Sequence, residues 1–239
     1  IHQSDLDEAR DRVTIGRSEA TNALLPEERH SVAVHESGHA LVAALSEHAD
    51  PVSKVTILPA GQSLGNTQTL PADERHLYPL SYLTDSLAVR LGGRAAELVV
   101  LGEPSTGAAS DLAGATDLAL HMVRDYGMSD RLGPVGFAAG SPAYLGTEEV
   151  RSRAYAEGTQ QVIDEEVERL LREAEQRATE LLNGHRAELE RLAALLVEQE
   201  TVDGAVVYEI VGRPVPSGAA QQVAPRSAAT SPVPAGATS

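Results

Sequence analysis

The segment VAVHESGHALVAA, residues 32–44, contains the side chains with the clearest capacity for chemistry, which are His35, Glu36 and His39. On an α-helix, which turns roughly 100° per residue, two histidines four positions apart lie within about 40° of each other. Two such imidazoles can bind one metal ion, and zinc suits them because its catalytic sites take neutral imidazole nitrogens and need only three protein ligands. Glu36 directly follows the first histidine, so it can reach a water molecule beside the metal. The pattern H-E-x-x-H therefore predicts two ligands and a general base for metal-assisted hydrolysis of an amide bond.

The same residues could instead be surface side chains of an ordinary amphipathic helix. Apolar residues on several sides of the segment argue for a buried helix, in which a His-Glu-His trio needs partners; they are Val32, Val34, Leu41, Val42 and Leu45. Gly38 lies inside this helix, where glycine costs about 1 kcal/mol relative to alanine. Close approach of another backbone is the expected reason for it.

The composition predicts a globular protein built mainly from helices. Hydrophobic residues make up 42% of the 239 residues but aromatic residues only 3%, so Leu, Val and Ala must form the core. A formal charge of −16 argues against nucleic acid as a partner. The absence of cysteine excludes disulfides and cysteine-ligated zinc. The only lysine, Lys54, follows Ser53, so the chain contains no Walker A phosphate-binding loop.

Nothing in the sequence predicts a membrane span. No apolar run approaches the 18 or so residues that such a span requires, and the first residues lack the features of a signal peptide. We therefore expect the chain as given to be soluble. Because it begins with Ile1, we interpret it as a piece of a longer protein or as a processed product.

The helix that carries the histidines is expected to run from Pro26 to about His48, because proline favours a first turn and Asp50-Pro51 ends a helix. Two short strands should follow, at residues 52–59 and 64–70. The second has the polar composition of an edge strand, whose free backbone groups could pair with an extended peptide. A plain hairpin edge without a ligand remains the alternative.

Further helices are expected from Ser81, with Gly92 and Gly93 midway, and from Ser110 to Gly127. Between residues 148 and 200 the apolar spacing predicts two helices that fold back on each other as a hairpin, and Asp203 should cap a last short helix or strand. We divide the chain into a connecting segment at 1–24, a domain at 25–213 that carries the predicted zinc site, and a disordered tail rich in Pro, Ala and Ser at 214–239.

The third metal ligand cannot be read from the short motif alone. The extended pattern H-E-x-x-H-x-x-G-x-x-H is excluded, because its glycine falls at Val42 and its third histidine at Leu45. Among the carboxylates that follow, most lie in turn-like segments or read as ordinary helix charges. Asp111, at a helix start between small residues, and Glu97, on the Gly-Gly helix, both remain as candidates.

Several motifs in a fixed order carry a resemblance to a known family. They are HESGHALVAAL, VSKVTILPAG, LGNTQTLP, LGGRAAELVV, STGAASDLAGAT, MVRDYGMS and LGPVGF. Together they resemble the peptidase domain of the FtsH family of ATP-dependent zinc metalloproteases, over roughly residues 6–210. The resemblance implies one zinc ion per chain, held by His35, His39 and Asp111, with Glu36 as the general base. Glu97 matches an acidic position near the site, for which we expect only a supporting role.

The resemblance also implies the architecture and the partners. It implies a mostly helical metallopeptidase domain with a small β-hairpin or edge strand, a homo-hexameric ring, and unfolded or misfolded polypeptides as substrates. Family members carry an ATPase module and a membrane segment upstream, so ATP and the membrane would act only through parts absent from this chain. The parent protein would lie in the inner or plasma membrane, with this domain facing the cytoplasm.

A second hypothesis is a ring-forming scaffold in which zinc is structural or absent. Glu36 argues against it, because a closed structural site has no use for a general base.

Overall fold

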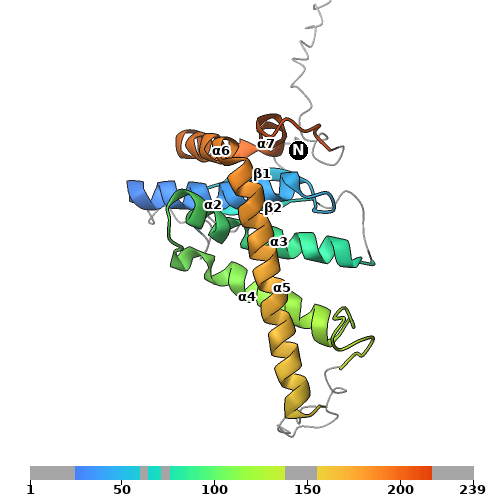
Figure 1. The fold of residues 1–239 in the computed structure, drawn as a ribbon. Helices are drawn as coiled ribbons and strands as arrows, with labels where there is room; N and C mark the ends of the chain where they lie inside the picture. The colour runs from blue at the N-terminus through green and yellow to red at the C-terminus, as the bar shows by residue number, and fades with distance from the viewer. Residues whose placement is uncertain (1–24, 60–63, 71–75, 138–154, 217–239) are drawn as a thin grey trace, which may run out of the picture.

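The computed structural model describes residues 25–59, 64–70, 76–137 and 155–216. Its elements in chain order are α2 (Pro26–Leu45), β1 (Val52–Thr56), β2 (Asn66–Thr69), α3 (Leu80–Val100), the 3-10 turn η1 (Thr106–Ala108), α4 (Ala109–Arg124), α5 (Glu157–Gly184), α6 (Arg186–Gln199), β3 (Thr201–Asp203) and α7 (Gly204–Ile210) (Figure 1). The predicted mostly helical fold class is confirmed. The predicted connecting segment at 1–24 and most of the predicted tail lie outside the described residues, and the domain bounds stay predictions.

Helix α2 forms the centre of the fold. It begins at Pro26 as predicted, and the Glu28 carboxylate accepts a hydrogen bond of 2.8 Å from the backbone N–H of Leu25, which closes the first turn. Every residue from Ala33 to Leu45 is buried, between α3 on one side and α6 on another. A Cβ added at Gly38 would lie only 2.3 Å from the backbone oxygen of Gly92. The close backbone approach predicted for Gly38 is therefore confirmed.

A three-stranded antiparallel sheet with the order β2-β1-β3 lies beside α2. Val55 of β1 is fully buried and pairs with Thr67 on one side and Val202 on the other. Within the described part of the chain, β2 is an edge strand, as predicted. Strand β3 was not predicted, because three residues are too few to show an alternating pattern.

Three predicted helix ends were wrong, including that of α4, which ends at Arg124 and not at Gly127. Helix α2 stops at Leu45 and not near His48, because Ser46 already has an extended backbone, with φ −88° and ψ 136°. Helix α3 begins at Leu80, one residue before Ser81, and Pro79 occupies the capping position. Proline fits there because it has no N–H to leave unsatisfied and its φ is fixed.

The two C-terminal helices are present and break near the predicted place, but they do not fold back on each other. Helix α5 packs on α3 and α4, whereas α6 crosses to α2 (Figure 1). Leu189, Leu192 and Leu196 of α6 are fully buried in the cluster around α2. The hairpin packing predicted for these helices is therefore corrected.

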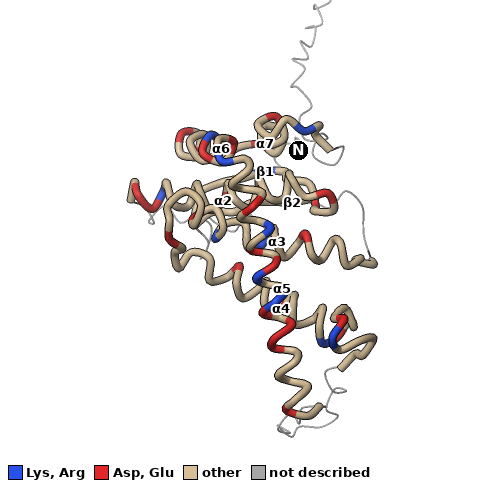
Figure 2. Tube along the Cα trace, viewed as in Figure 1, with Lys and Arg blue, Asp and Glu red and all other residues tan. Residues whose placement is uncertain are grey.

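Charged residues of both signs are interspersed along α5 (Figure 2). Its exposed face carries ion pairs one helical turn apart, such as Arg169 with Glu173 at 2.8 Å. Such pairs each stabilise an exposed helix by a few tenths of a kcal/mol. Within the described ranges, no helix combines the length and the apolar character that crossing a bilayer requires.

Candidate metal centre and active site

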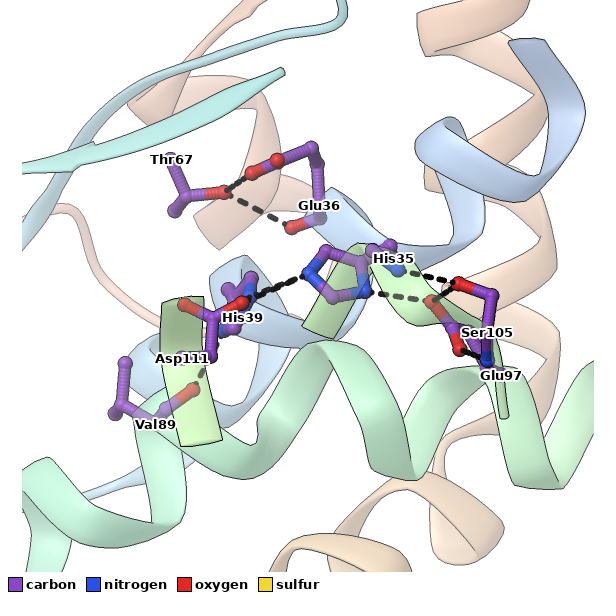
Figure 3. A network of polar contacts seen from close by, with 9 residues as sticks. His35, Glu36, His39, Thr67, Val89, Glu97, Ser105 and Asp111 are labelled. Carbon is purple, nitrogen blue, oxygen red and sulfur yellow. Dashed lines mark hydrogen bonds and ion pairs between the residues drawn. The ribbon is translucent and has the colours of Figure 1, made fainter. Parts of the chain in front are cut away.

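Three side chains from two helices converge at the middle of α2 (Figure 3). Nε2 of His35 lies 3.0 Å from Nε2 of His39, and Oδ2 of Asp111 lies 3.2 Å and 3.6 Å from these two nitrogens. Asp111 comes from the first turn of α4. Among the described residues, this is the only group of three or more His, Cys, Asp or Glu side chains whose ligand atoms lie close enough together to hold one metal ion.

The electrostatics of this cluster fit a cation. Burial by itself would lower the pKa of His39, but the hydrogen bond to Asp111 and the charges of Glu36 and Asp111 raise it to about 9. Burial would raise the pKa of Asp111, but its contacts with the two imidazoles lower it far below its usual value. An ionised carboxylate thus faces two ring nitrogens that are 3.0 Å apart, and a proton or a metal ion must lie among them. The donor set of two imidazoles and one carboxylate is one that zinc accepts.

The far side of each imidazole ring is held by a hydrogen-bond acceptor. Nδ1 of His39 donates to the backbone oxygen of Val89 at 2.7 Å, and since a carbonyl can only accept, this nitrogen must carry the proton. Nδ1 of His35 contacts Oε1 of Glu97 at 2.8 Å. When the rings are neutral, as metal ligands must be, a proton held on Nδ1 leaves Nε2 with the lone pair, and both Nε2 atoms face Asp111.

Glu97 lies behind His35 and not within the His-His-Asp group. Its side chain is 1% exposed, and it also accepts hydrogen bonds from the backbone N–H and the hydroxyl of Ser105, which precedes η1. Glu97 therefore joins His35 on α2 to the segment that leads into α4 and Asp111. Of the two carboxylates that sequence reasoning left open, only Asp111 faces both Nε2 atoms.

Glu36 points from the same helix toward the sheet (Figure 3). It is 7% exposed, and Thr67 of β2 donates a hydrogen bond of 2.7 Å to its Oε2. Burial raises the pKa of the Glu36 carboxyl, against the lowering effect of His39, Thr67 and His35. Sequence reasoning missed Thr67 and the Val89 carbonyl, because neither a polar residue on an edge strand nor a backbone atom gives a signal in one sequence.

The space for the two imidazoles depends on Gly93 of α3. A Cβ at this position would lie 2.5 Å from Cε1 and Nε2 of His35 and 2.6 Å from Nε2 of His39. These distances are far below van der Waals contact, so any side chain here would displace both rings. The Gly-Gly pair thus serves two close approaches, Gly92 to the α2 backbone and Gly93 to the histidine side chains.

Comparison with known proteins agrees with this geometry. The ATP-dependent zinc metalloprotease FtsH of Acidothermus cellulolyticus is 64% identical over 210 residues, which cover 87% of this chain and 32% of that protein. The proteins of the same name from Acidimicrobium ferrooxidans and Hahella chejuensis are 49% and 45% identical, over 94% and 87% of this chain and 34% of each protein. The chain thus spans about a third of the length of these curated relatives. The family model of peptidase family M41 matches residues 22–210, and the chain therefore belongs to this family.

Proposed function

We propose that this chain is a zinc-dependent endopeptidase that cleaves unfolded or misfolded polypeptides, and that it is the proteolytic portion of a longer ATP-dependent protease. The observation that carries the proposal is the convergence of His35, His39 and Asp111, with the buried carboxylate of Glu36 close enough to interact electrostatically with all three. Membership of a peptidase family and the names of the relatives support it.

In this proposal Nε2 of His35, Nε2 of His39 and the carboxylate of Asp111 hold one zinc ion. When bound, zinc supplies a Lewis acid that polarises the scissile carbonyl and lowers the pKa of water. Glu36 takes the proton from the attacking water and then donates it to the leaving amine. Burial raises the pKa of the Glu36 carboxyl, which brings a carboxylate closer to the range in which it can both accept and return a proton. Glu97 and Val89 keep the two rings oriented.

The sheet edge beside Glu36 is the proposed place for the substrate. Strand β2 has a neighbour on one side only within the described chain, so its other side offers backbone N–H and C=O groups. An extended peptide can pair with such an edge through its own backbone. Because backbone groups make the hydrogen bonds, this mode of binding accepts many peptide sequences. This suits an enzyme that cleaves unfolded chains, because unfolding exposes the backbone that must pair.

The remaining parts of the proposal concern the longer protein. The relatives are named ATP-dependent, and this chain has no Walker A lysine, so ATP would act through a separate module. The family resemblance supports a homo-hexameric assembly and a membrane-anchored parent with this domain on the cytoplasmic side. Mass measured by light scattering would test the hexamer.

Removal of metal tests the proposed activity directly. Dialysis of the chain against a chelator should abolish hydrolysis of unfolded casein, and one equivalent of zinc should restore it, because only the ion polarises the carbonyl. A hydroxamate should block cleavage without changing the assembled mass. Casein cleavage that survives complete removal of zinc would refute the proposal. A zinc-containing chain without any peptidase activity would favour the scaffold.

Gly93→Ala should impair the metal site by steric clash alone, because it changes no ligand and no charge. Because the new methyl group would displace both imidazoles, we expect zinc affinity to fall by at least about tenfold, as changes around metal ligands commonly do, and casein hydrolysis to fall with it. The measurement is chelator competition together with casein hydrolysis.

Gly158→Ala is the matched control for this variant. Gly158 is also helical but has open space around its Cβ position, so the substitution should leave affinity and activity unchanged. Wild-type zinc affinity in Gly93→Ala would contradict the geometry described here.

A further inference from the structure

The hydroxyl of Thr67 makes its shortest contact with the carboxylate of Glu36 (Figure 3). The distance to Oε2 is 2.7 Å, and the distance to the backbone oxygen of the same residue is 3.1 Å. A threonine hydroxyl has one hydrogen to donate. The shorter distance and the charge of the acceptor indicate that the hydroxyl donates this hydrogen to the carboxylate oxygen and not to the backbone oxygen. A hydrogen bond to a charged acceptor is the stronger of the two.

Gly65 confines the other side of the same carboxylate. A Cβ at this position would lie 2.8 Å from both Cγ and Oε1 of Glu36. Gly65 and Thr67 are two residues apart in an extended segment, so they face the same side. Thr67 therefore contacts one carboxylate oxygen of Glu36 through its hydroxyl. Gly65 leaves room for the other oxygen because it has no side chain.

The position of Thr67 is itself fixed by the core. It pairs across the sheet with Val55, which is fully buried and belongs to the cluster around α2. The strand that carries the hydroxyl and the helix that carries Glu36 thus rest on the same apolar cluster. This arrangement holds donor and acceptor at a set distance.

From these contacts we infer that Thr67 is a positioning residue for Glu36: its hydroxyl holds the carboxylate in one rotamer, aimed at the place where water is deprotonated. The inference rests on the proposed peptidase function and adds a second role for β2 beside peptide pairing. Without the hydroxyl, the carboxylate can turn among its staggered rotamers and spends less time in the productive one. A misplacement of about 1 Å in a catalytic group can cost about 100-fold in rate.

The test compares Thr67→Val with Thr67→Ser in the zinc-loaded chain. Valine keeps the shape and removes the hydroxyl, so kcat for cleavage of an unfolded casein substrate should fall by about tenfold to 100-fold. KM should stay within about twofold and zinc content at the wild-type level, because neither the strand edge nor the ligands change. Serine keeps the donor and should recover most of kcat.

Thr84→Val serves as the matched control. The Thr84 hydroxyl donates to the backbone oxygen of Leu80 within α3, at 2.8 Å, and takes no part in the site. This variant should keep wild-type kcat and KM.

A second variant reaches the same carboxylate without touching Thr67. Gly65→Ala should push the Glu36 side chain aside and lower kcat with zinc retained, whether or not Thr67→Val folds. Wild-type kcat in Gly65→Ala would mean that the rate does not depend on where the Glu36 carboxylate is held, and it would overturn the inference.

The outcomes separate this inference from the proposed function. A wild-type chain that does not cleave casein refutes the peptidase function itself. An active wild type with unchanged kcat in Thr67→Val, or with Thr67→Ser as slow as Thr67→Val, overturns the positioning role. A change confined to KM also overturns it and assigns Thr67 to substrate binding.

Discussion

Replacing Glu36 with glutamine is expected to abolish peptide hydrolysis and leave one zinc ion bound per chain. Glutamine has nearly the same shape, so the backbone of α2 and both imidazoles should stay in place, but its amide cannot accept a proton. A general base contributes about 10² to 10⁴ in rate, and kcat should fall by that factor. Casein hydrolysis and elemental analysis of the same preparation measure the two effects.

Glu27→Gln is the matched control for this change. Glu27 lies on the same helix but in its exposed first turn, far from the histidines. Activity and zinc content should both equal those of the wild type. Substantial activity in Glu36→Gln would remove Glu36 from the proposed role, and loss of its zinc would assign the side chain to metal retention instead.

Asp111→Ala is expected to empty the metal site. The carboxylate supplies the one anionic ligand of the proposed set, and its Oδ2 lies 3.2 Å and 3.6 Å from the two imidazole nitrogens. Two histidines alone fall short of the three protein ligands that a catalytic zinc site uses. Zinc per chain, measured by native mass spectrometry, should therefore fall close to zero, and casein hydrolysis with it.

Asp117→Ala provides the comparison on the same helix. Asp117 is exposed and lies one to two turns further along α4, outside the metal-binding group. This variant should keep its zinc and its activity. Full zinc occupancy in Asp111→Ala would exclude Asp111 as a ligand.

The sequence predicted the central helix well because the physical signals there are local. A spacing of four places His35 and His39 on one face by helix geometry alone. Pro26 and the acidic first turn predict where α2 begins, and the apolar surroundings predict its burial. All three features are present in the structure.

The third member of the group could not be derived from local signals. Asp111 lies 76 residues after His35, and the residues alone left Asp111 and Glu97 open. The family resemblance favoured Asp111. In the structure both carboxylates contact His35, but on opposite ring nitrogens, and this distinction depends on how α3 and α4 pack.

The same limit explains the error at the C-terminal helices. Apolar spacing shows which face of α5 or α6 is buried but not which partner buries it. Each helix found a partner earlier in the chain, α5 on α3 and α6 on α2. The contact between Thr67 and Glu36 could not be predicted for a related reason, because the two residues lie 31 positions apart in the sequence.

The most direct test of the central claim is a crystal structure of the zinc-loaded chain with anomalous diffraction data at the zinc absorption edge. We expect one anomalous peak per chain, about 2.0–2.2 Å from Nε2 of His35, Nε2 of His39 and a carboxylate oxygen of Asp111. A peak at another site, or an ion held by the two histidines with Asp111 out of bonding reach, would contradict it.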